Sequence, residues 1–184
     1  YSFTLNVTYQ LKYNTLKVTF DVLNKNDHPM YFSIGAHPGF NCPLDSNTKF
    51  TDYRLTFDNP VSADCLKLEN DSIGKIIYNY LDNDRHIPLT ETLFDDDALI
   101  FRDINSSSVT LESDLSPAKV KVDFDSFHYL GFWAKPQTQK YVCIEPWFGI
   151  DDFKSFDGDI SDKQGILKIA PKQVFTCSYS ITCT

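Results

Sequence analysis

The sequence predicts an all-β protein, most simply a large twisted β-sandwich, on three observations. Apolar and polar residues alternate from Phe3 to Leu11, and the pattern repeats from Leu16 to Val22 after a turn near Asn14. Successive side chains of a strand point to opposite faces of a sheet, so this alternation predicts a β-hairpin with one buried face. No segment carries an apolar stripe at helical spacing over three turns.

Further segments along the chain have the composition of strands. They are short, rich in β-branched or aromatic residues, and separated by clusters of Asn, Asp, Pro and Gly, which favour turns. The predicted strands are 53–57, 75–80, 99–102, 109–112, 119–124, 129–134, 141–145, 165–169 and 174–181. At most a short helix is expected within 155–162.

The composition suits one folded domain, residues 1–184. The chain has 17 basic and 25 acidic residues, which gives a formal net charge of −8, and 42% of its residues are hydrophobic. This hydrophobic fraction is too high for a disordered chain, and a chain of this length can bury a sizeable core. Nucleic acids and anionic membranes both attract basic surfaces, so the acidic balance predicts neither partner.

The cysteines and the first residues bear on the cellular compartment. No apolar run approaches the roughly 20 residues of a transmembrane helix. The segment from Tyr1 to Leu5 lacks the basic and apolar blocks of a signal peptide. Five cysteines leave one over in any disulfide scheme, and none forms a CxxC pair. Free thiols are typical of a reducing compartment, so we expect a cytoplasmic protein.

The spacing of candidate ligands predicts no metal site. The four histidines include no close pair, so a zinc site has no support from the sequence. The acidic residues of 151–162 lack the spacing of a calcium loop, and a solvated loop is expected there. A phosphate-binding glycine loop and the G-x-S-x-G elbow of serine hydrolases are also missing.

Two short segments place a titratable side chain where the backbone is tightly specified. In SIGAHPGF, residues 33–40, His37 lies between Gly35 and a Pro-Gly pair. In CIEPW, residues 143–147, Glu145 ends an apolar strand just before Pro and Trp. A carboxyl group in such a place either forms a structural ion pair or has a perturbed pKa and a function. From composition alone, a structural role is the more common one for each.

Four strings, in this order, carry a resemblance to a known family: FSIGAHPGFN, LFDDDALIF, GFWAKP and YVCIEPW. With them the chain resembles the aldose 1-epimerase (galactose mutarotase) family, and is most similar to its bacterial LacX-like branch. The opening hairpin resembles the family's central hairpin, and KQGILKIAPKQVFTCSYSI resembles its last two strands. The resemblance implies a galactose mutarotase-like supersandwich, with a sugar-binding cleft on one face.

The same resemblance implies a reaction and its residues. Family members interconvert the α and β anomers of aldoses, here a hexose, without a cofactor. His37 matches the general acid, Glu145 the general base, and Asp97 a carboxylate that binds sugar hydroxyls. The adjacent Asp95 and Asp96 leave the register of that last match open, and a solvated turn is its alternative. The scheme requires Glu145 ionised and His37 protonated near neutral pH.

Other residues bear on the sugar and on the alternatives. Phe40, Trp133 and Trp147 offer aromatic faces for stacking, although core packing explains each equally simply. A phosphorylated sugar favours clustered basic residues, and only Lys135 and Lys140 lie close to the motifs. The alternatives to an enzyme are a non-catalytic sugar-binding module and an incomplete fragment.

The chain is shorter than the family's domain. It resembles the C-terminal two-thirds of that domain, and the N-terminal strands, with an Arg and a second His of the family's cleft, have no counterpart. Three explanations stay open: a fragment, one part of a split protein, or a shortened relative. A first residue other than Met favours the fragment. An N-terminal fragment or a second chain is then the expected partner, because a truncated sandwich exposes edges and apolar surface.

Overall fold

The computed structural model describes residues 1–124, 126–138 and 140–184 and confirms an all-β architecture. The strands are β1 (Phe3–Lys12), β2 (Thr15–Asn24), β3 (Met30–Phe32), β4 (Ile34–Gly35), β5 (Gly39–Asn41), β6 (Arg54–Leu68), β7 (Ile73–Pro88), β8 (Leu99–Arg102), β9 (Ser108–Ser113), β10 (Ser116–Asp123), β11 (Tyr129–Trp133), β12 (Tyr141–Phe148), β13 (Leu167–Ile169) and β14 (Val174–Cys183). Two single-turn 3-10 helices, η1 (Phe50–Asp52) and η2 (Ile160–Asp162), complete the described elements. Within these described ranges, no helix has the length and apolar character needed to cross a membrane.

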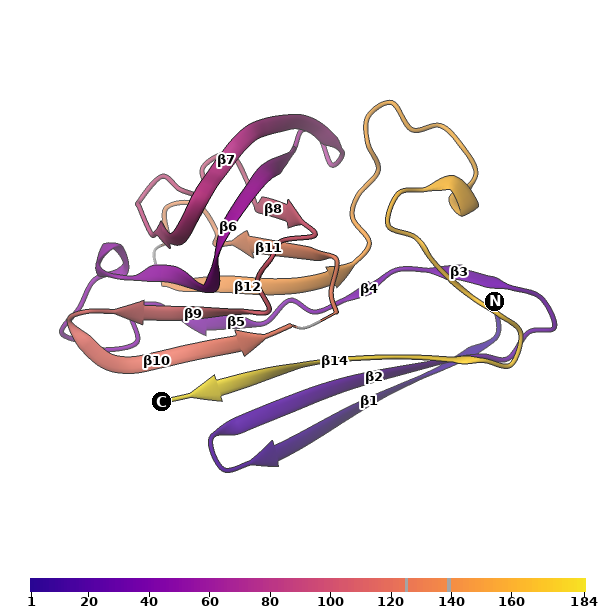
Figure 1. Ribbon diagram of the computed structural model, residues 1–184, viewed down its shortest axis with the longest axis horizontal. Helices are drawn as coiled ribbons and strands as arrows, with labels where there is room; N and C mark the ends of the chain where they lie inside the picture. Colours follow the sequence, from indigo (N-terminus) through magenta and orange to yellow (C-terminus); the bar gives the residue numbers. More distant parts are fainter. Residues whose placement is uncertain (125, 139) are drawn as a thin grey trace.

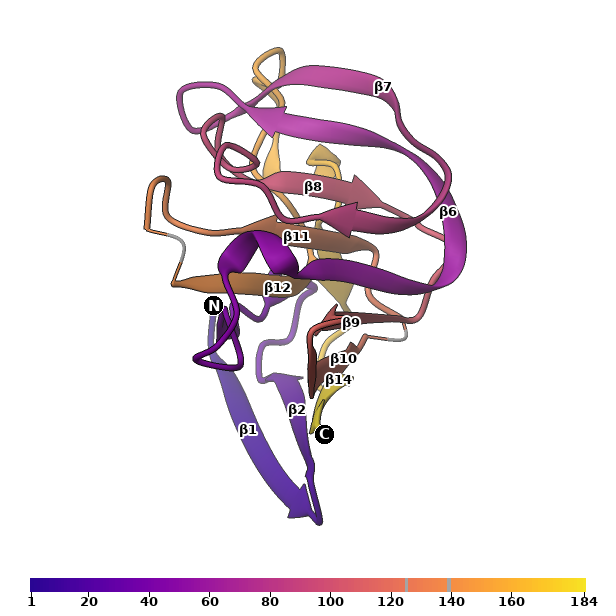
Figure 2. The same cartoon turned by 90° about the vertical axis from the view of Figure 1, so that its left-hand side faces the viewer.

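Twelve strands form one curled sheet, and β3 and β13 form a separate ladder. The order in the large sheet is β1-β2-β14-β10-β9-β6-β8-β11-β12-β4, with β5 paired to β12 and β7 to β6. Figures 1 and 2 show the curl, which brings β1, β2 and β14 beneath the layer of β9 and β12. The main core joins the two layers, with Val18 and Tyr179 from one and Phe57, Phe101 and Phe132 from the other. The predicted twisted β-sandwich is confirmed.

Strand β12 is buried on both faces, and this positions the candidate site. Val142 and Ile144 belong to the main core. Because side chains alternate along a strand, Cys143, Glu145 and Trp147 point to the other face. That face carries a second apolar cluster, with members from β6, β7, β8, β11 and the segment after β12. Strand β12 pairs with β11 along one edge and with the short strands β4 and β5 along the other.

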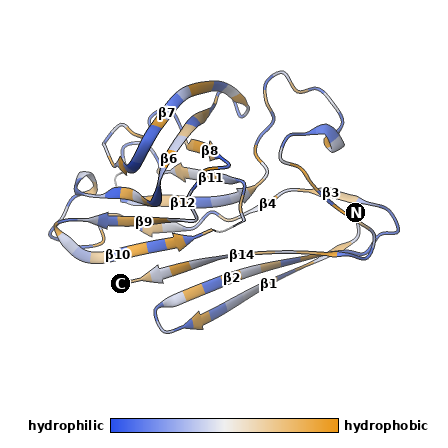
Figure 3. Cartoon of the chain, in the orientation of Figure 1, coloured by the Kyte–Doolittle hydropathy of each residue, from blue (hydrophilic) through white to orange (hydrophobic). Residues whose placement is uncertain are grey.

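The predicted hairpin is present, but the prediction that its first strand has a buried face is wrong. Strands β1 and β2 pair in continuous register from Phe3 opposite Asn24 to Lys12 opposite Thr15. Figure 3 shows apolar and polar residues alternating along β2. On β1 the apolar side chains are exposed, and Leu11 is 74% exposed. The reason is the position of β1 at the end of the sheet order: the core covers β2 and the strand beyond it, β14, instead.

The other strand predictions agree with the structure, with differences at the short elements. Each of the predicted segments overlaps a strand, and β6 and β7 extend beyond the predicted bounds. The expected helix within 155–162 is only the single turn η2. Strands β3, β4 and β5 are not predicted from the sequence, because strands of two or three residues are too short to show an alternation.

Candidate active site

His37 lies in the irregular segment between β4 and β5, and backbone hydrogen bonds fix that segment along β12. The N–H of Ala36 donates to the carbonyl oxygen of Pro146 over 3.0 Å. The N–H of Ile144 donates over 3.2 Å to the carbonyl oxygen of the proline that follows His37. These two bonds flank Glu145 on either side. The local backbone therefore sets the imidazole beside the carboxyl group.

The two side chains form a close pair of unequal burial. His37 Nε2 lies 3.3 Å from Glu145 Oε1, and the side chains are 62% and 3% exposed, respectively. Within the described part of the chain, Glu145 Oε1 has no hydrogen-bond partner. The contact is thus at ion-pair distance without the alignment of a hydrogen bond. The carboxyl oxygen keeps its capacity to take part in proton transfer.

The environment of Glu145 favours its neutral form. Burial raises the pKa of Glu145 to about 8; the indole N–H of Trp147 opposes this effect, and the negative charge of Asp97 adds to it. The sequence-based expectation was a Glu145 ionised near neutral pH. The structure instead favours a protonated carboxyl group up to about pH 8 in the absence of a ligand.

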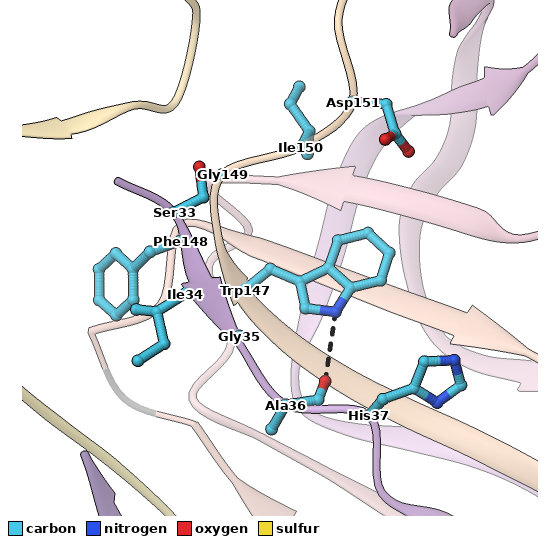
Figure 4. Close-up of a pocket in the computed structure, with 10 residues that line it drawn as sticks. All are labelled: Ser33, Ile34, Gly35, Ala36, His37, Trp147, Phe148, Gly149, Ile150 and Asp151. Carbon is cyan, nitrogen blue, oxygen red and sulfur yellow. Dashed lines mark hydrogen bonds between the residues drawn. The ribbon is translucent and has the colours of Figure 1, made fainter. Parts of the chain in front are cut away.

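The indole of Trp147 is held beside the pair by a hydrogen bond and by two glycines. Its Nε1–H donates to the carbonyl oxygen of Ala36 over 3.2 Å (Figure 4). A Cβ atom on Gly35 would lie 2.6 Å from Trp147 Cδ1, and one on Gly131 would lie 2.6 Å from Trp147 Cη2. Both distances are far below van der Waals contact, so the ring keeps this position only with glycine at both sites.

An open hollow lies next to His37 (Figure 4). Residues 33–37 and 147–151 line it, including His37 and Trp147 but not the buried Glu145. The ring of Trp133 meets the imidazole edge-on, with centroids 5.9 Å apart and an interplanar angle of 82°. Aromatic surface combined with a few convergent polar groups is typical of a small-molecule site.

Asp97 lies on the turn before β8 in a left-handed backbone conformation, with φ of 67°. Its Oδ1 accepts the N–H of Ala98 over 2.7 Å, and Lys67 Nζ donates to its carbonyl oxygen over 2.9 Å. Its charge acts on Glu145, but Asp97 lines a neighbouring depression rather than the hollow beside His37. Asp95 and Asp96 line the same depression, so the geometry does not single out one of the three acids.

The three aromatic candidates differ in position. Phe40 packs against the main core, whereas Trp133 and Trp147 lie beside the pair and pack against the second cluster. The other histidines contact nearby polar side chains: His28 with Asp27, His86 with Thr56, and His128 with Asp103.

Two residues next to the site were missed from the sequence. Cys143 shares a strand face with Glu145, and the ligand atoms of His37, Cys143 and Glu145 all lie within 4.8 Å of one another. The sequence contains one signal of this proximity: Cys143 and Glu145 are two residues apart on a predicted strand, so their side chains point to the same face. Lys67 is buried and donates to the carbonyl oxygens of Asp97 and Ala98, each over 2.9 Å. No sequence signal links it to that distant turn.

Comparison with known proteins places the chain in a family. The family model described as aldose 1-epimerase matches residues 1–159. Protein LacX of Lactococcus lactis subsp. lactis, in its plasmid form, is 32% identical over 186 residues, which cover 99% of this chain and 62% of LacX. The chain therefore spans less than two thirds of that relative's length.

Solved structures give the same result. A galactose mutarotase related enzyme from Lactobacillus acidophilus has a TM-score of 0.87 and 34% identity, over 99% of this chain and 61% of that one. A galactose mutarotase-like protein from Lactobacillus casei has a TM-score of 0.84 and 24% identity, over 99% and 63%. From the family match and these likenesses, we conclude that the chain belongs to the aldose 1-epimerase family and is LacX-like.

Proposed function

We propose that this chain carries the proton-transfer pair of an aldose 1-epimerase that interconverts the α and β anomers of a hexose. The observation that carries the proposal is the 3.3 Å separation of His37 Nε2 and Glu145 Oε1, which come from segments far apart in the sequence. Membership of the family supports isomerase chemistry at this pair.

Opening the ring of a hemiacetal removes one proton from the C1 hydroxyl group and adds one to the ring oxygen. Glu145 as a carboxylate accepts the first proton, and His37 as an imidazolium donates the second as the bond from C1 to the ring oxygen breaks. The open aldehyde rotates about C1–C2 and closes on its other face. The two groups then act in reverse and regain their starting protonation states. General acid–base catalysis of this kind typically contributes about 10²–10⁴-fold.

The raised pKa of Glu145 is compatible with the role of a base. A general base works best when its pKa lies near the working pH, because it must be both available and strong. With a pKa of about 8, ionised Glu145 is a much stronger base than an exposed carboxylate. The ionised fraction of Glu145 increases as pH rises toward 8, but the scheme also needs a protonated His37, so the rate is expected to pass through a maximum, the bell-shaped pH dependence of an acid–base pair.

The groups around the pair are proposed to bind a neutral hexose. Asp97 offers a carboxylate for sugar hydroxyls, and Trp133 and Trp147 offer aromatic surface next to His37. The buried cation nearby, Lys67, is already engaged by two backbone carbonyl oxygens, so a sugar phosphate is not the ligand that we propose. No cofactor takes part in this scheme.

Polarimetry tests the reaction. Fresh α-glucose or α-galactose is added to the natural protein and to the variants His37→Asn, Glu145→Gln and His128→Asn. His128 is a matched control, because it is a similarly exposed histidine that pairs with an aspartate. We expect mutarotation faster than solvent for the natural protein and the control, and a loss of about 100-fold or more in the other two variants. Equal rates in all four proteins would exclude the proposed pair.

A non-catalytic sugar-binding module is the second candidate, favoured by one observation. A pKa of about 8 leaves most of Glu145 protonated at neutral pH, where a base must be ionised. Calorimetry that detects sugar binding, together with mutarotation no faster than solvent, would favour this function. An incomplete fragment would show neither, and would not unfold in one cooperative transition.

We also propose a cytoplasmic location and a covering partner. All five cysteines are free thiols, including the exposed Cys183, which is typical of a reducing compartment. The exposed apolar side chains of β1 are proposed to be covered by an N-terminal fragment or a second chain, so that residues 1–184 correspond to the C-terminal two-thirds of one domain.

A further inference from the structure

The proton-transfer pair has a third neighbour that the proposed reaction does not use. One ligand atom each from His37, Cys143 and Glu145 lies within 4.8 Å of the other two. Among the described residues, no other group of three His, Cys, Asp or Glu side chains shares this arrangement. A nitrogen, a sulfur and a carboxylate oxygen that converge in this way are a set of metal ligands.

The distances suit a tetrahedral zinc ion. Zinc binds nitrogen and oxygen at about 2.0–2.1 Å and sulfur at about 2.3 Å. In a tetrahedron with those bond lengths, neighbouring nitrogen and oxygen ligands are about 3.3 Å apart, and sulfur lies about 3.6 Å from each. The separation of His37 Nε2 and Glu145 Oε1 is 3.3 Å. All three ligand atoms lie within 4.8 Å of one another. The sulfur therefore has to move by at most about 1 Å to reach its tetrahedral separation from the other two.

The sheet holds all three ligands in place before any ion binds. Cys143 and Glu145 are two residues apart on β12, so both point to the same face. Gly39 lies opposite Cys143 in the strand pairing, and a Cβ on that glycine would lie 3.4 Å from the sulfur. The segment that carries His37 is fixed to β12 by backbone hydrogen bonds on both sides of Glu145.

The burial of the ligands leaves one open coordination position. Cys143 and Glu145 are buried, whereas the His37 side chain is 62% exposed beside the hollow. An ion between them has protein on one side and solvent on the other, as in zinc sites with three protein ligands and a bound water. Ligands of zinc must be deprotonated, so binding at neutral pH releases the thiol proton of Cys143 and the carboxyl proton of Glu145 to solvent.

We propose that His37, Cys143 and Glu145 form a Zn²⁺ site that overlaps the sugar site. Zinc accepts nitrogen, thiolate and carboxylate ligands together, whereas magnesium and calcium require oxygen ligands. The sequence had no support for zinc because the ligands come from two distant segments, with a single histidine among them.

Zinc at this site excludes the proposed reaction, because the ion takes the Nε2 and Oε1 atoms that exchange protons with the sugar. This consequence rests on the proposed function, whereas the binding of zinc does not. The site would therefore make the enzyme sensitive to free Zn²⁺, with inhibition that competes with the sugar.

Titration with Co²⁺, a coloured substitute for Zn²⁺, tests binding without any reference to activity. We expect thiolate-to-cobalt absorption bands and d–d bands of tetrahedral intensity, both abolished when Zn²⁺ displaces the cobalt. Mg²⁺ at the same concentration should have no effect. The absence of thiolate bands, or octahedral d–d bands only, would overturn the proposal even if the protein proves an active mutarotase.

Variants locate the ion. Cys143→Ser should remove the thiolate bands and weaken Zn²⁺ binding by about tenfold or more. Cys177→Ser is the matched control, because Cys177 is equally buried on a strand but lies outside the cluster. His37→Ala changes an exposed side chain and should fold normally, yet it should also weaken binding by about tenfold or more. Unchanged Zn²⁺ affinity in His37→Ala, or an equal loss in Cys177→Ser, would contradict the assignment.

Discussion

At the scale of single residues, the candidate site is governed by a buried carboxyl group whose Oε1 has no hydrogen-bond partner within the described part of the chain. Glu145 is buried under an exposed histidine, on a strand that is apolar on both sides. Its neutral form is favoured because burial removes the solvation that stabilises a carboxylate. The burial that suits Glu145 to its proposed role as a proton acceptor therefore also makes the stability of the folded protein sensitive to pH.

The pH dependence of stability follows from this shift. The pKa of Glu145 is about 8 in the folded protein, against a reference value of 4.5. Between these values the folded state holds a proton that the unfolded chain releases, so the free energy of unfolding falls as pH rises. The fall corresponds to about 1.4 kcal/mol per pH unit at most, or a few kcal/mol in total. Below pH 4.5 both states hold the proton, and the full contribution of Glu145 to the free energy of unfolding is present.

Urea unfolding at several pH values checks this prediction. Glu145→Gln should lack the decrease between pH 4.5 and 8, because glutamine does not titrate. Glu91→Gln replaces an exposed glutamate and should follow the natural protein. Parallel profiles for the natural protein and Glu145→Gln would show that burial does not raise this pKa.

Gly131 offers a second test at the residue scale. A methyl group at Gly131 would lie 2.6 Å from the ring of Trp147, so the indole must move in Gly131→Ala. Overpacking of this kind typically costs about 1–3 kcal/mol. We expect that loss in urea unfolding, with a change in tryptophan fluorescence. Gly39→Ala on β5 is the control, because its nearest contact is 3.4 Å. Identical emission and stability in Gly131→Ala would contradict the assigned position of the ring.

At the scale of elements, Lys67 connects β6 to the acidic turn before β8. Its ammonium group donates to the carbonyl oxygens of Asp97 and Ala98, each over 2.9 Å, and burial lowers its pKa. These two acceptors lose their donor in Lys67→Met. A buried polar group without a partner costs about 1–3 kcal/mol, so the free energy of unfolding should fall by that amount.

Hydrogen exchange separates a local from a global effect of this variant. The N–H of Ala98 donates to Asp97 Oδ1, so its exchange should accelerate in Lys67→Met if the turn loosens. Lys75→Met is the matched control, because Lys75 lies opposite Lys67 in the strand pairing but is exposed. A Lys67→Met variant as stable as Lys75→Met would mean that the two hydrogen bonds do not hold the turn.

The elements that sequence patterns predicted are those long enough to show an alternation. The pairing of β1 with β2 and the positions of β8, β9, β10, β12 and β14 followed from period-two patterns and turn residues. The short strands β4 and β5 did not, although they hold His37 in place. Their position depends on hydrogen bonds to the distant strand β12, and a local pattern contains no information about such pairing.

The candidate site was predictable only in part for the same reason. His37 and Glu145 were found through motifs, and the tightly specified backbone around His37 proved to be the segment fixed along β12. The raised pKa of Glu145 and the proximity of Cys143 arise from tertiary packing. The exposure of β1 was also missed, because alternation shows that a face is apolar but not what covers it.

At the scale of the whole molecule, the exposed apolar side chains of β1 should make the 184-residue chain associate. Tyr9 and Leu11 are 69% and 74% exposed on a terminal strand with a free edge, a combination that favours pairing with another chain. The net charge of −8 opposes association, and salt screens that repulsion over about 8 Å at physiological ionic strength. Sedimentation velocity should therefore show oligomers that increase with concentration, in the range of about 10–100 µM, and with salt.

Threonine keeps strand propensity while removing apolar area, so Tyr9→Thr with Leu11→Thr should shift the chain toward monomer. Tyr78→Thr with Leu115→Thr, at apolar sites of similar exposure away from β1, should not. A chain that stays monomeric across this range, or a control pair that dissociates it equally, would remove β1 as the associating surface.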